Sequence, residues 1–222
     1  MDAILEQLFG ALVAIATTIT VEYLRRPKLK LDIATPVDLT YSAGTRLAKK
    51  ARYLLVSCTN KPLPWCFRWM QRNAATDCHG SLTLHHLDGQ NYFGRSMPLR
   101  WSGSPEPIPL QVSIGGAVAS IFDPNRNSTE SLVDIQPGEQ RACDTAVKFD
   151  DEPECYGWSN SNYSSNPPWR HPDWRLPAGR YLVRVIMVSA GQRCEAIFRV
   201  VNDVPQRDFR LEQPLPGDSI RG

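Results

Sequence analysis

Four acidic side chains stand within five residues and could bind a metal ion. Asp150, Asp151, Glu152 and Glu154 open the segment DDEPECYGWSNSNYSSNPPWRHPDW, which runs from residue 150 to residue 174. Clustered carboxylates are the ligands that Ca²⁺ and Mg²⁺ prefer, but the run lacks the spaced D-x-D-x-D-G pattern of calcium loops. Consecutive residues on a strand also point to opposite faces. We therefore expect these acids to be solvated, with no metal and no other cofactor bound.

Two neighbouring pairs, Cys78–His79 and His85–His86, could in principle supply a thiol and a base. A catalytic Cys–His pair has to be assembled by the fold, and adjacent residues on a strand diverge. The chain contains no GxSxG, GxxxxGK[ST], HExxH or GxGxxG motif. The sequence therefore predicts that the protein is not an enzyme.

The segment 150–174 also carries five aromatic residues that could bind a partner: Tyr156, Trp158, Tyr163, Trp169 and Trp174. Tyrosine and tryptophan offer large contact areas at a low entropy cost, and the intervening Ser and Asn supply adaptable hydrogen bonds. One interpretation is an exposed, rigid recognition surface for a protein or a small-molecule ligand. The other is an ordered loop that buries its own aromatics, because connections of this length are unusual in a compact domain.

The overall charge argues against a nucleic-acid partner. The 222 residues include 25 basic and 23 acidic side chains, which give a net charge of +2. Proteins that bind nucleic acids usually show a clustered basic footprint. The basic cluster Arg25, Arg26, Lys28 and Lys30 instead follows directly on an apolar segment, where it is typical of a membrane flank.

The segment before that cluster, Ile4 to Leu24, has the length and composition of a membrane-spanning helix. A helix of about 20 residues crosses the hydrocarbon core of a bilayer. Pro27 then ends the helix. An interfacial or partner-packed helix and a cleaved signal peptide are the alternatives, although Asp2 and Glu6 stand where a signal peptide carries basic residues.

The asymmetry of charge around this segment predicts its orientation. Four cations follow the helix and none precedes it, so the positive-inside rule places the rest of the chain in the cytoplasm.

A reducing compartment keeps thiols free, and no CxxC pair or ligand-spaced histidine suggests zinc. We therefore expect the six cysteines to be reduced structural thiols: Cys58, Cys66, Cys78, Cys143, Cys155 and Cys194. The alternatives are disulfides in an outward-facing domain and a metal site.

Beyond the anchor the sequence predicts a mainly β fold. Short runs rich in β-branched and aromatic residues alternate with Pro, Gly, Asn and Asp, and two alternating runs joined by a turn around Gly191 indicate an antiparallel hairpin. We expect an antiparallel, immunoglobulin-like β-sandwich. The anchor would occupy residues 1–26, the sandwich residues 27–212, and a frayed tail residues 213–222. The candidate strands are 29–34, 52–60, 81–87, 109–114, 131–135, 142–149, 179–190, 194–202 and 209–212.

Four patches spread along the chain carry a resemblance to a group of proteins. They are VEYLRRPKLKLDI (21–33), PLRWSGSPEP (98–107), VKFDDEPECYGWSNSNY (147–163) and WRLPAGRYLVRV (174–185). On these patches the chain resembles uncharacterised bacterial single-span membrane-anchored proteins with a C-terminal β-sandwich (Ig-like) domain. The resemblance implies this architecture in a bacterium and brings no activity with it.

Together these features predict a membrane-tethered cytoplasmic β-sandwich that works as a binding module at the bacterial inner membrane. Its partners would be the lipid bilayer and a protein or small-molecule ligand. The alternative is a membrane effector of an antiviral or stress-response system, which clusters on sensing a ligand and perturbs the membrane. Gly10, Ala14 and Thr18, spaced four residues apart, would then support a homo-oligomer through the span.

Overall fold

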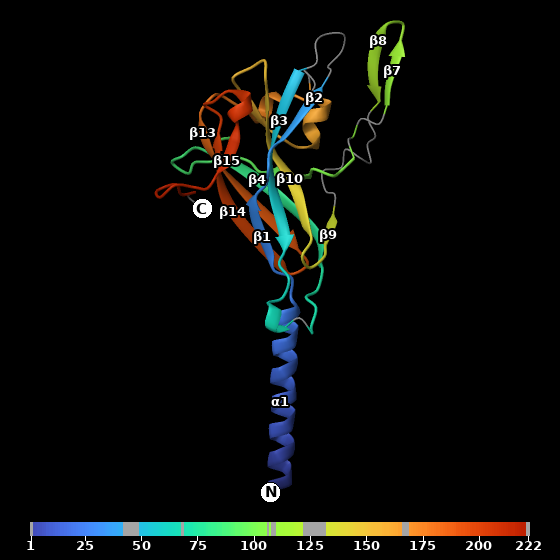
Figure 1. The fold of residues 1–222 in the computed structure, drawn as a ribbon, viewed down its shortest axis with the longest axis vertical. Helices are drawn as coiled ribbons and strands as arrows, with labels where there is room; N and C mark the ends of the chain where they lie inside the picture. The colour runs from blue at the N-terminus through green and yellow to red at the C-terminus, as the bar shows by residue number, and fades with distance from the viewer. Residues whose placement is uncertain are drawn as a thin grey trace.

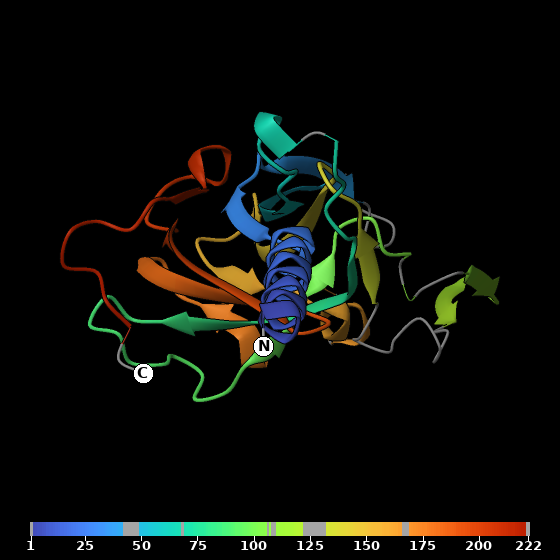
Figure 2. The ribbon, with the colours of Figure 1, turned by 90° about the horizontal axis from the view of Figure 1, so that it is seen from below.

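The computed structural model describes residues 2–41, 49–67, 69–105, 107, 110–121, 132–165 and 169–220. A single long helix, α1 (Asp2–Arg25), extends from one end of a β-rich body (Figure 1). Seen from below, the helix stands under the body, and one hairpin reaches out to the side (Figure 2). That hairpin consists of β7 (Leu110–Ile114) and β8 (Ala117–Ile121).

The helix α1 has no buried residue along its apolar length. Its stretch Glu6–Arg25 is long and apolar enough to cross a membrane, and none of that stretch is buried against the body. The hydroxyls of Thr17, Thr18 and Thr20 donate to the carbonyls four residues earlier at 2.8–2.9 Å. These polar groups are therefore satisfied inside the helix, as a hydrocarbon environment requires.

One sheet of the body has seven strands, all in antiparallel pairs. Its main order is β1-β3-β10-β11-β12; β2 pairs with the half of β3 that β1 leaves free, and β6 pairs with β10. The strands are β1 (Leu29–Ile33), β2 (Val37–Tyr41), β3 (Lys49–Asn60), β6 (Arg100–Trp101), β10 (Gln140–Phe149), β11 (Cys155–Gly157) and β12 (Arg175–Leu176).

The second sheet has six strands and packs against the first. Its order is β15-β14-β13-β4-β5, and β9 pairs with β4. The strands are β4 (Ala75–His85), β5 (Met97–Pro98), β9 (Val133–Ile135), β13 (Arg180–Ser189), β14 (Gln192–Val201) and β15 (Arg210–Glu212). Short 3-10 turns lie in the connections: η1 (Trp65–Phe67), η2 (Asn160–Ser164), η3 (Pro172–Trp174) and η4 (Gln206–Asp208).

The main core lies between the two sheets, on the faces that strand alternation predicted. Tyr181, Val183, Val185 and Met187 of β13 are buried there, opposite residues of β3 such as Val56. The predicted antiparallel sandwich is therefore confirmed, together with a β13–β14 hairpin. The immunoglobulin-like connectivity stays a prediction.

The strands that the sequence did not reveal are short. They are β2, β5, β6, β8, β11 and β12, each of two to five residues. Runs of this length carry little periodicity, and their extended form depends on the partner strand. The tail expected to fray carries an ion pair, Arg199–Asp218 at 3.7 Å, in which both side chains are nearly buried.

A buried asparagine joins the helix to the sandwich. Asn60, at the end of β3, is fully buried; its side chain accepts from the Lys28 N–H at 3.1 Å and donates to the carbonyls of Asn73 and Ile135 at 3.0 and 3.1 Å. The Asn73 N–H in turn donates to the Arg25 carbonyl at 2.7 Å. The exit of α1, the β3–β4 connection and β9 are thereby tied together at one point.

Candidate functional site

After β11 the chain folds back over the outer face of the seven-stranded sheet, through the described residues Trp158 to Ser165 and Trp169. Trp158 and Tyr163 pack there on Val147 and Phe149 of β10, whose side chains point away from the main core. The rings of Trp158 and Tyr163 meet edge to face at 5.3 Å. We call this second core the outer aromatic cluster: Ala51, Val147, Phe149, Tyr156, Trp158 and Tyr163, with Tyr53 and Trp169 packed against it.

This burial corrects the interpretation that the five aromatics form an exposed recognition surface. Tyr156, Trp158 and Tyr163 are 4%, 1% and 6% exposed, and Trp169 is half-buried. Trp174, 7% exposed, belongs to the main core instead. The outer face of the sheet carries large apolar side chains that need a cover, and the loop supplies it.

Three of the four acids, Asp151, Glu152 and Glu154, are paired with arginines and are not simply solvated, whereas Asp150 is exposed. Arg170 donates to Glu152 and to Asp151, each at 2.7 Å, and its guanidinium stacks 4.1 Å from the centre of the Phe149 ring. Glu154 pairs with Arg175. These contacts tie the two ends of the loop together. Over the described part of the chain, no three His, Cys, Asp or Glu side chains gather in a way that could hold a metal ion.

A hollow of about 360 Å³ opens between strand β2 and the outer aromatic cluster. Its rim is apolar and open, because Val37 and Leu39 of β2 are 41% and 50% exposed. Strand β2 lies at the end of the sandwich remote from α1 (Figure 1). We call this hollow the β2 pocket; it is lined by Val37, Leu39, Tyr53, Leu55, Arg100, Ser102, Ser104, Asp144, Trp158 and Tyr163.

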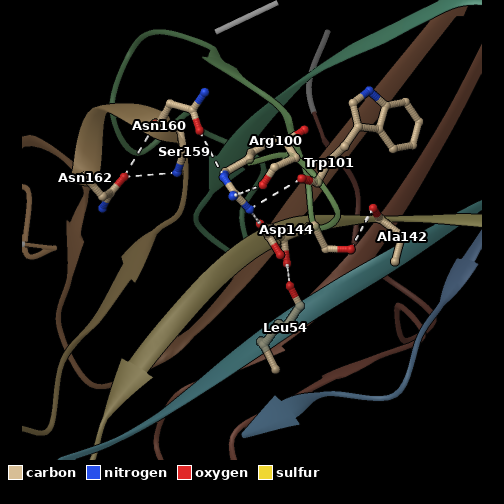
Figure 3. A network of polar contacts seen from close by, with 11 residues as sticks. Leu54, Arg100, Trp101, Ala142, Asp144, Ser159, Asn160 and Asn162 are labelled. Atoms are coloured by element: carbon tan, nitrogen blue, oxygen red, sulfur yellow. Dashed lines mark hydrogen bonds and ion pairs between the residues drawn. The ribbon is translucent and has the colours of Figure 1, made fainter. Parts of the chain in front are cut away.

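The floor of the β2 pocket is a buried ion pair. Arg100 and Asp144 are 6% and 4% exposed, and Arg100 Nη1 donates to Asp144 Oδ2 at 2.8 Å. Arg100 also donates through Nε to Asn160 Oδ1 at 2.9 Å and through Nη2 to the Ser104 carbonyl at 2.7 Å. Its guanidinium lies 5.5 Å from the centre of the Tyr163 ring. Figure 3 shows Arg100 reaching from β6 between Asn160 of the loop and Asp144 of β10.

A β-bulge places Asp144 on this floor. The register between β3 and β10 shifts between Asp144 and Ala146, so that Thr145 is an extra residue. Bulges of this kind re-aim side chains and are common beside functional sites. Burial raises the pKa of Asp144 to about 6, while the charge of Arg100 acts in the opposite direction. The pocket thus holds a carboxyl group that can change charge near neutral pH.

The cysteines are free and mostly buried. Cys58, Cys78, Cys143 and Cys155 are buried, Cys194 is half-buried and Cys66 is exposed. Burial raises the pKa of Cys78, and that of Cys58 to about 12, which keeps these thiols protonated and poorly nucleophilic. Cys78 and His79 do not act together either, because His79 is exposed and its Nδ1 lies 2.9 Å from the Asp77 carbonyl oxygen.

The cations predicted to flank a membrane are exposed at the junction of the helix and the sandwich. Arg25, Arg26, Lys28 and Lys30 all point to solvent in the structure. Arg25 lies 3.9 Å from Glu22, and Lys30 lies 2.6 Å from Asp32. Exposed pairs of this kind contribute little to stability, so these two contacts do not fix the cations in place.

Sequence reasoning missed the two residues at the centre of the pocket. Arg100 stands in the patch PLRWSGSPEP and Asp144 in the strand run ACDTAVKF, and neither belongs to a motif. The signal that could have marked them is a charged residue inside an apolar, strand-like run, because such a charge is almost always paired when it is buried.

Comparison with protein-family models, with curated proteins and with solved structures found no match for the chain. The resemblance to bacterial membrane-anchored proteins therefore stays a prediction.

The outer aromatic cluster predicts that Trp158 is a structural residue. We expect Trp158→Ala to lower the free energy of unfolding by about 3–5 kcal/mol, the usual cost of emptying a buried Trp site. The half-buried Trp169, changed to Ala, should cost clearly less. Urea unfolding of the full chain in mild detergent, followed by far-ultraviolet circular dichroism, measures both. A small and equal loss in the two variants would contradict the cluster.

The raised pKa of Asp144 predicts a pH dependence. The folded state binds the proton of the Asp144 carboxyl more tightly than the unfolded chain does, since that carboxyl titrates near 3.8 in the unfolded chain. The stabilisation that this proton gives to the folded state is therefore lost as the pH rises through about 6. We expect the difference in unfolding free energy between the wild type and Asp144→Asn to fall by up to about 3 kcal/mol from about pH 4 to 7.

The matched control is Asp38→Asn, because the hydrogen bond from Arg52 lowers the pKa of Asp38. The Arg52–Asp38 pair stabilises the folded state above the pKa of Asp38 in the unfolded chain, and this stabilisation is lost as the pH falls. The difference in unfolding free energy between the wild type and Asp38→Asn should therefore rise with pH. A difference for Asp144→Asn that also rises would show that Arg100 dominates over burial.

Proposed function

We propose that the protein is a membrane-tethered binding module, in which the sandwich presents the β2 pocket to a partner. The observation that carries this proposal is the pocket itself: an open apolar rim, aromatic walls and a buried Arg100–Asp144 pair as its floor. Concave, largely apolar sites with a few convergent polar groups and a perturbed carboxyl are the usual form of a ligand site.

The chemistry of the rim favours a protein partner. Val37 and Leu39 stand exposed on β2, which pairs with β3 along one edge; among the described residues no strand pairs with its other edge. An extended peptide can add to such an edge through its main chain and place alternate side chains in neighbouring pockets. An apolar side chain of that peptide would enter the β2 pocket beside Trp158 and Tyr163. A small amphipathic molecule is the second candidate for the same pocket.

Binding is favoured over catalysis by the chemistry of the titratable groups. Burial raises the pKa of Cys58 to about 12, and the raised pKa of Asp144 belongs to a carboxyl that Arg100 holds, with no cysteine or histidine among the described residues that line the pocket. A nucleophile needs a depressed pKa or an adjacent base, and the four buried thiols have neither a depressed pKa nor access to solvent. We therefore assign the pocket to recognition.

The helix α1 would hold this module at a bacterial inner membrane, with the sandwich in the cytoplasm. The length and apolar composition of Glu6–Arg25 support a span, and the cations from Arg25 to Lys30 support the inward orientation. Tethering raises the local concentration of the pocket at the bilayer, so that even weak recognition is effective there.

The first test is photo-crosslinking at the rim. With benzoylphenylalanine in place of Leu39, we expect a discrete crosslinked product in membranes of the natural host, detected as a larger band or as a mass increment. The same probe in place of Leu215, which is 53% exposed at the far C-terminal segment, should give none. Adding Val37→Lys to the Leu39 probe should reduce the product more than about tenfold, because a charge in an apolar rim must be desolvated. Identical products at positions 39 and 215 would overturn the proposed pocket function.

The second test addresses orientation. A Leu215→Cys variant in a Cys66→Ser background carries an exposed thiol on the sandwich, and Cys66→Ser alone is the matched control. We expect a membrane-impermeant maleimide to label the variant only after the cells are permeabilised, because the positive-inside rule keeps this domain inward. Labelling of intact cells would place the sandwich outside.

A further inference from the structure

The two most exposed large hydrophobic side chains in the described part of the chain are Trp65 and Trp69, at 83% and 78%. Both lie in the connection between β3 and β4, which reads KPLPWCFRWMQRNA from residue 61 to residue 74. Burying a tryptophan is strongly favourable, so two largely exposed tryptophans in a single connection mark a contact surface. Tryptophan is also the residue that membrane proteins place at the boundary between lipid and water.

This connection lies beside the C-terminal half of α1. Figure 1 shows η1 at the height where the helix meets the sandwich, and Figure 2 shows it to one side of the helix axis. The connection and the helix together enclose an apolar surface hollow of about 450 Å³. Residues from both sides line it, among them Val13, Thr17, Val21, Phe67, Trp69 and Met70.

Polar contacts hold the connection at this level. The Asn73 N–H donates to the Arg25 carbonyl at 2.7 Å, and Arg72 donates to the Arg26 carbonyl, so two free carbonyls at the end of α1 are satisfied by the connection. Asn60, fully buried, donates to the Asn73 carbonyl at 3.0 Å. The tryptophans therefore have a fixed height relative to the end of the helix.

That height is the boundary of the bilayer that α1 would span. With Arg25 and Arg26 among the headgroups, a rise of about 1.5 Å per residue puts Leu24 and Val21, at the near end of the hollow, within about 6 Å of the headgroups. Val13, at the far end of the hollow, lies about 18 Å along the helix. The hollow lined by Phe67, Trp69 and Met70 thus opens on the lipid side of the headgroups.

The backbone of the connection suits such a place. Pro62 and Pro64 carry no N–H, and the N–H groups of Phe67 and Met70 donate to the carbonyls of Pro64 and Phe67, both at 2.9 Å. Several of its backbone donors are therefore absent or already satisfied, which lowers the cost of leaving water.

We propose that the β3–β4 connection, through its described residues 61–67 and 69–74, is a second membrane contact, which places Trp65 and Trp69 in the interfacial layer of the leaflet from which α1 emerges. The partner is the lipid bilayer itself. This inference rests on the proposed span of α1 and adds that the sandwich is held at two points. Two points restrict the tilt of the sandwich on its stalk and keep the β2 pocket directed away from the membrane.

The test uses brominated lipids, which quench the fluorescence of tryptophans that touch acyl chains. The full chain is reconstituted in vesicles of phosphatidylcholine and phosphatidylglycerol at about three to one, with bromine near the headgroup or deep in the chain; the anionic fraction serves the flanking cations. The helix α1 contains no tryptophan, so the span contributes no signal. We expect shallow bromines to quench about one third of the emission, because two of the six tryptophans are at the interface, and deep bromines to quench less.

In a Trp65→Phe/Trp69→Phe variant most of this quenching should disappear, whereas Trp169→Phe, on the outer aromatic cluster, should retain it. Both substitutions at 65 and 69 are at exposed positions, so the fold is kept. Alkaline extraction of the same vesicles separates the two proposals. A protein that resists extraction but shows no quenching, or the same quenching in the double variant, overturns the membrane contact and leaves the anchor intact. A protein released by extraction overturns the anchor, and the contact that rests on it.

Discussion

The constraint on which the rest of the structure depends is that the central pair of strands, β3 and β10, is apolar on both faces. One face of β10 enters the main core through Cys143 and Ala146, and the other carries Val147 and Phe149 to the outside. An antiparallel sheet of this kind cannot leave its second face in water, so part of the chain must cover it. The cover is the aromatic segment after β11. Its tryptophans and tyrosines therefore pack the loop against the sheet, and the arginines that pair with its acids connect the two ends of the loop.

The β2 pocket lies where the aromatic segment no longer covers the sheet. Between this segment and β2 the hollow is open, and Arg100 and Asp144 are buried beneath its apolar rim. A buried charge is tolerated when it is paired and hydrogen-bonded, and Arg100 reaches Asp144, Asn160 and the Ser104 carbonyl. The same arginine that links β6 to β10 and to the loop thus gives the pocket a polar floor. Asn60 holds the exit of α1 at the other end of the sandwich, so β2 and the helix lie at opposite ends of it (Figure 1).

Much of the fold could be predicted from the sequence, because it depends on the local pattern of apolar, polar and turn-forming residues. The apolar length of α1 with its basic flank, the alternating runs of β3, β10 and β13, and the turn at Gly191 follow from hydrophobic period and turn chemistry. These features need no knowledge of which strand lies next to which. For the aromatic segment the sequence left two interpretations, an exposed recognition surface and a loop that buries its own aromatics. It did not decide between them, because both use the same residues.

By itself, then, the sequence determined the helix, the β class, the inward-facing positions of the long strands and the aromatic nature of the loop. Tertiary structure alone decided that the loop covers the outer face, and that Arg100 meets Asp144, which lies 44 residues along the chain. It also decided that Trp65 and Trp69 are exposed, with Trp69 beside the helix, while the other tryptophans are buried or half-buried. The physical reason is that periodicity assigns a residue to a face, whereas pairing across sheets, a β-bulge at Thr145 and the hydrogen bonds of a buried Asn60 decide what that face meets.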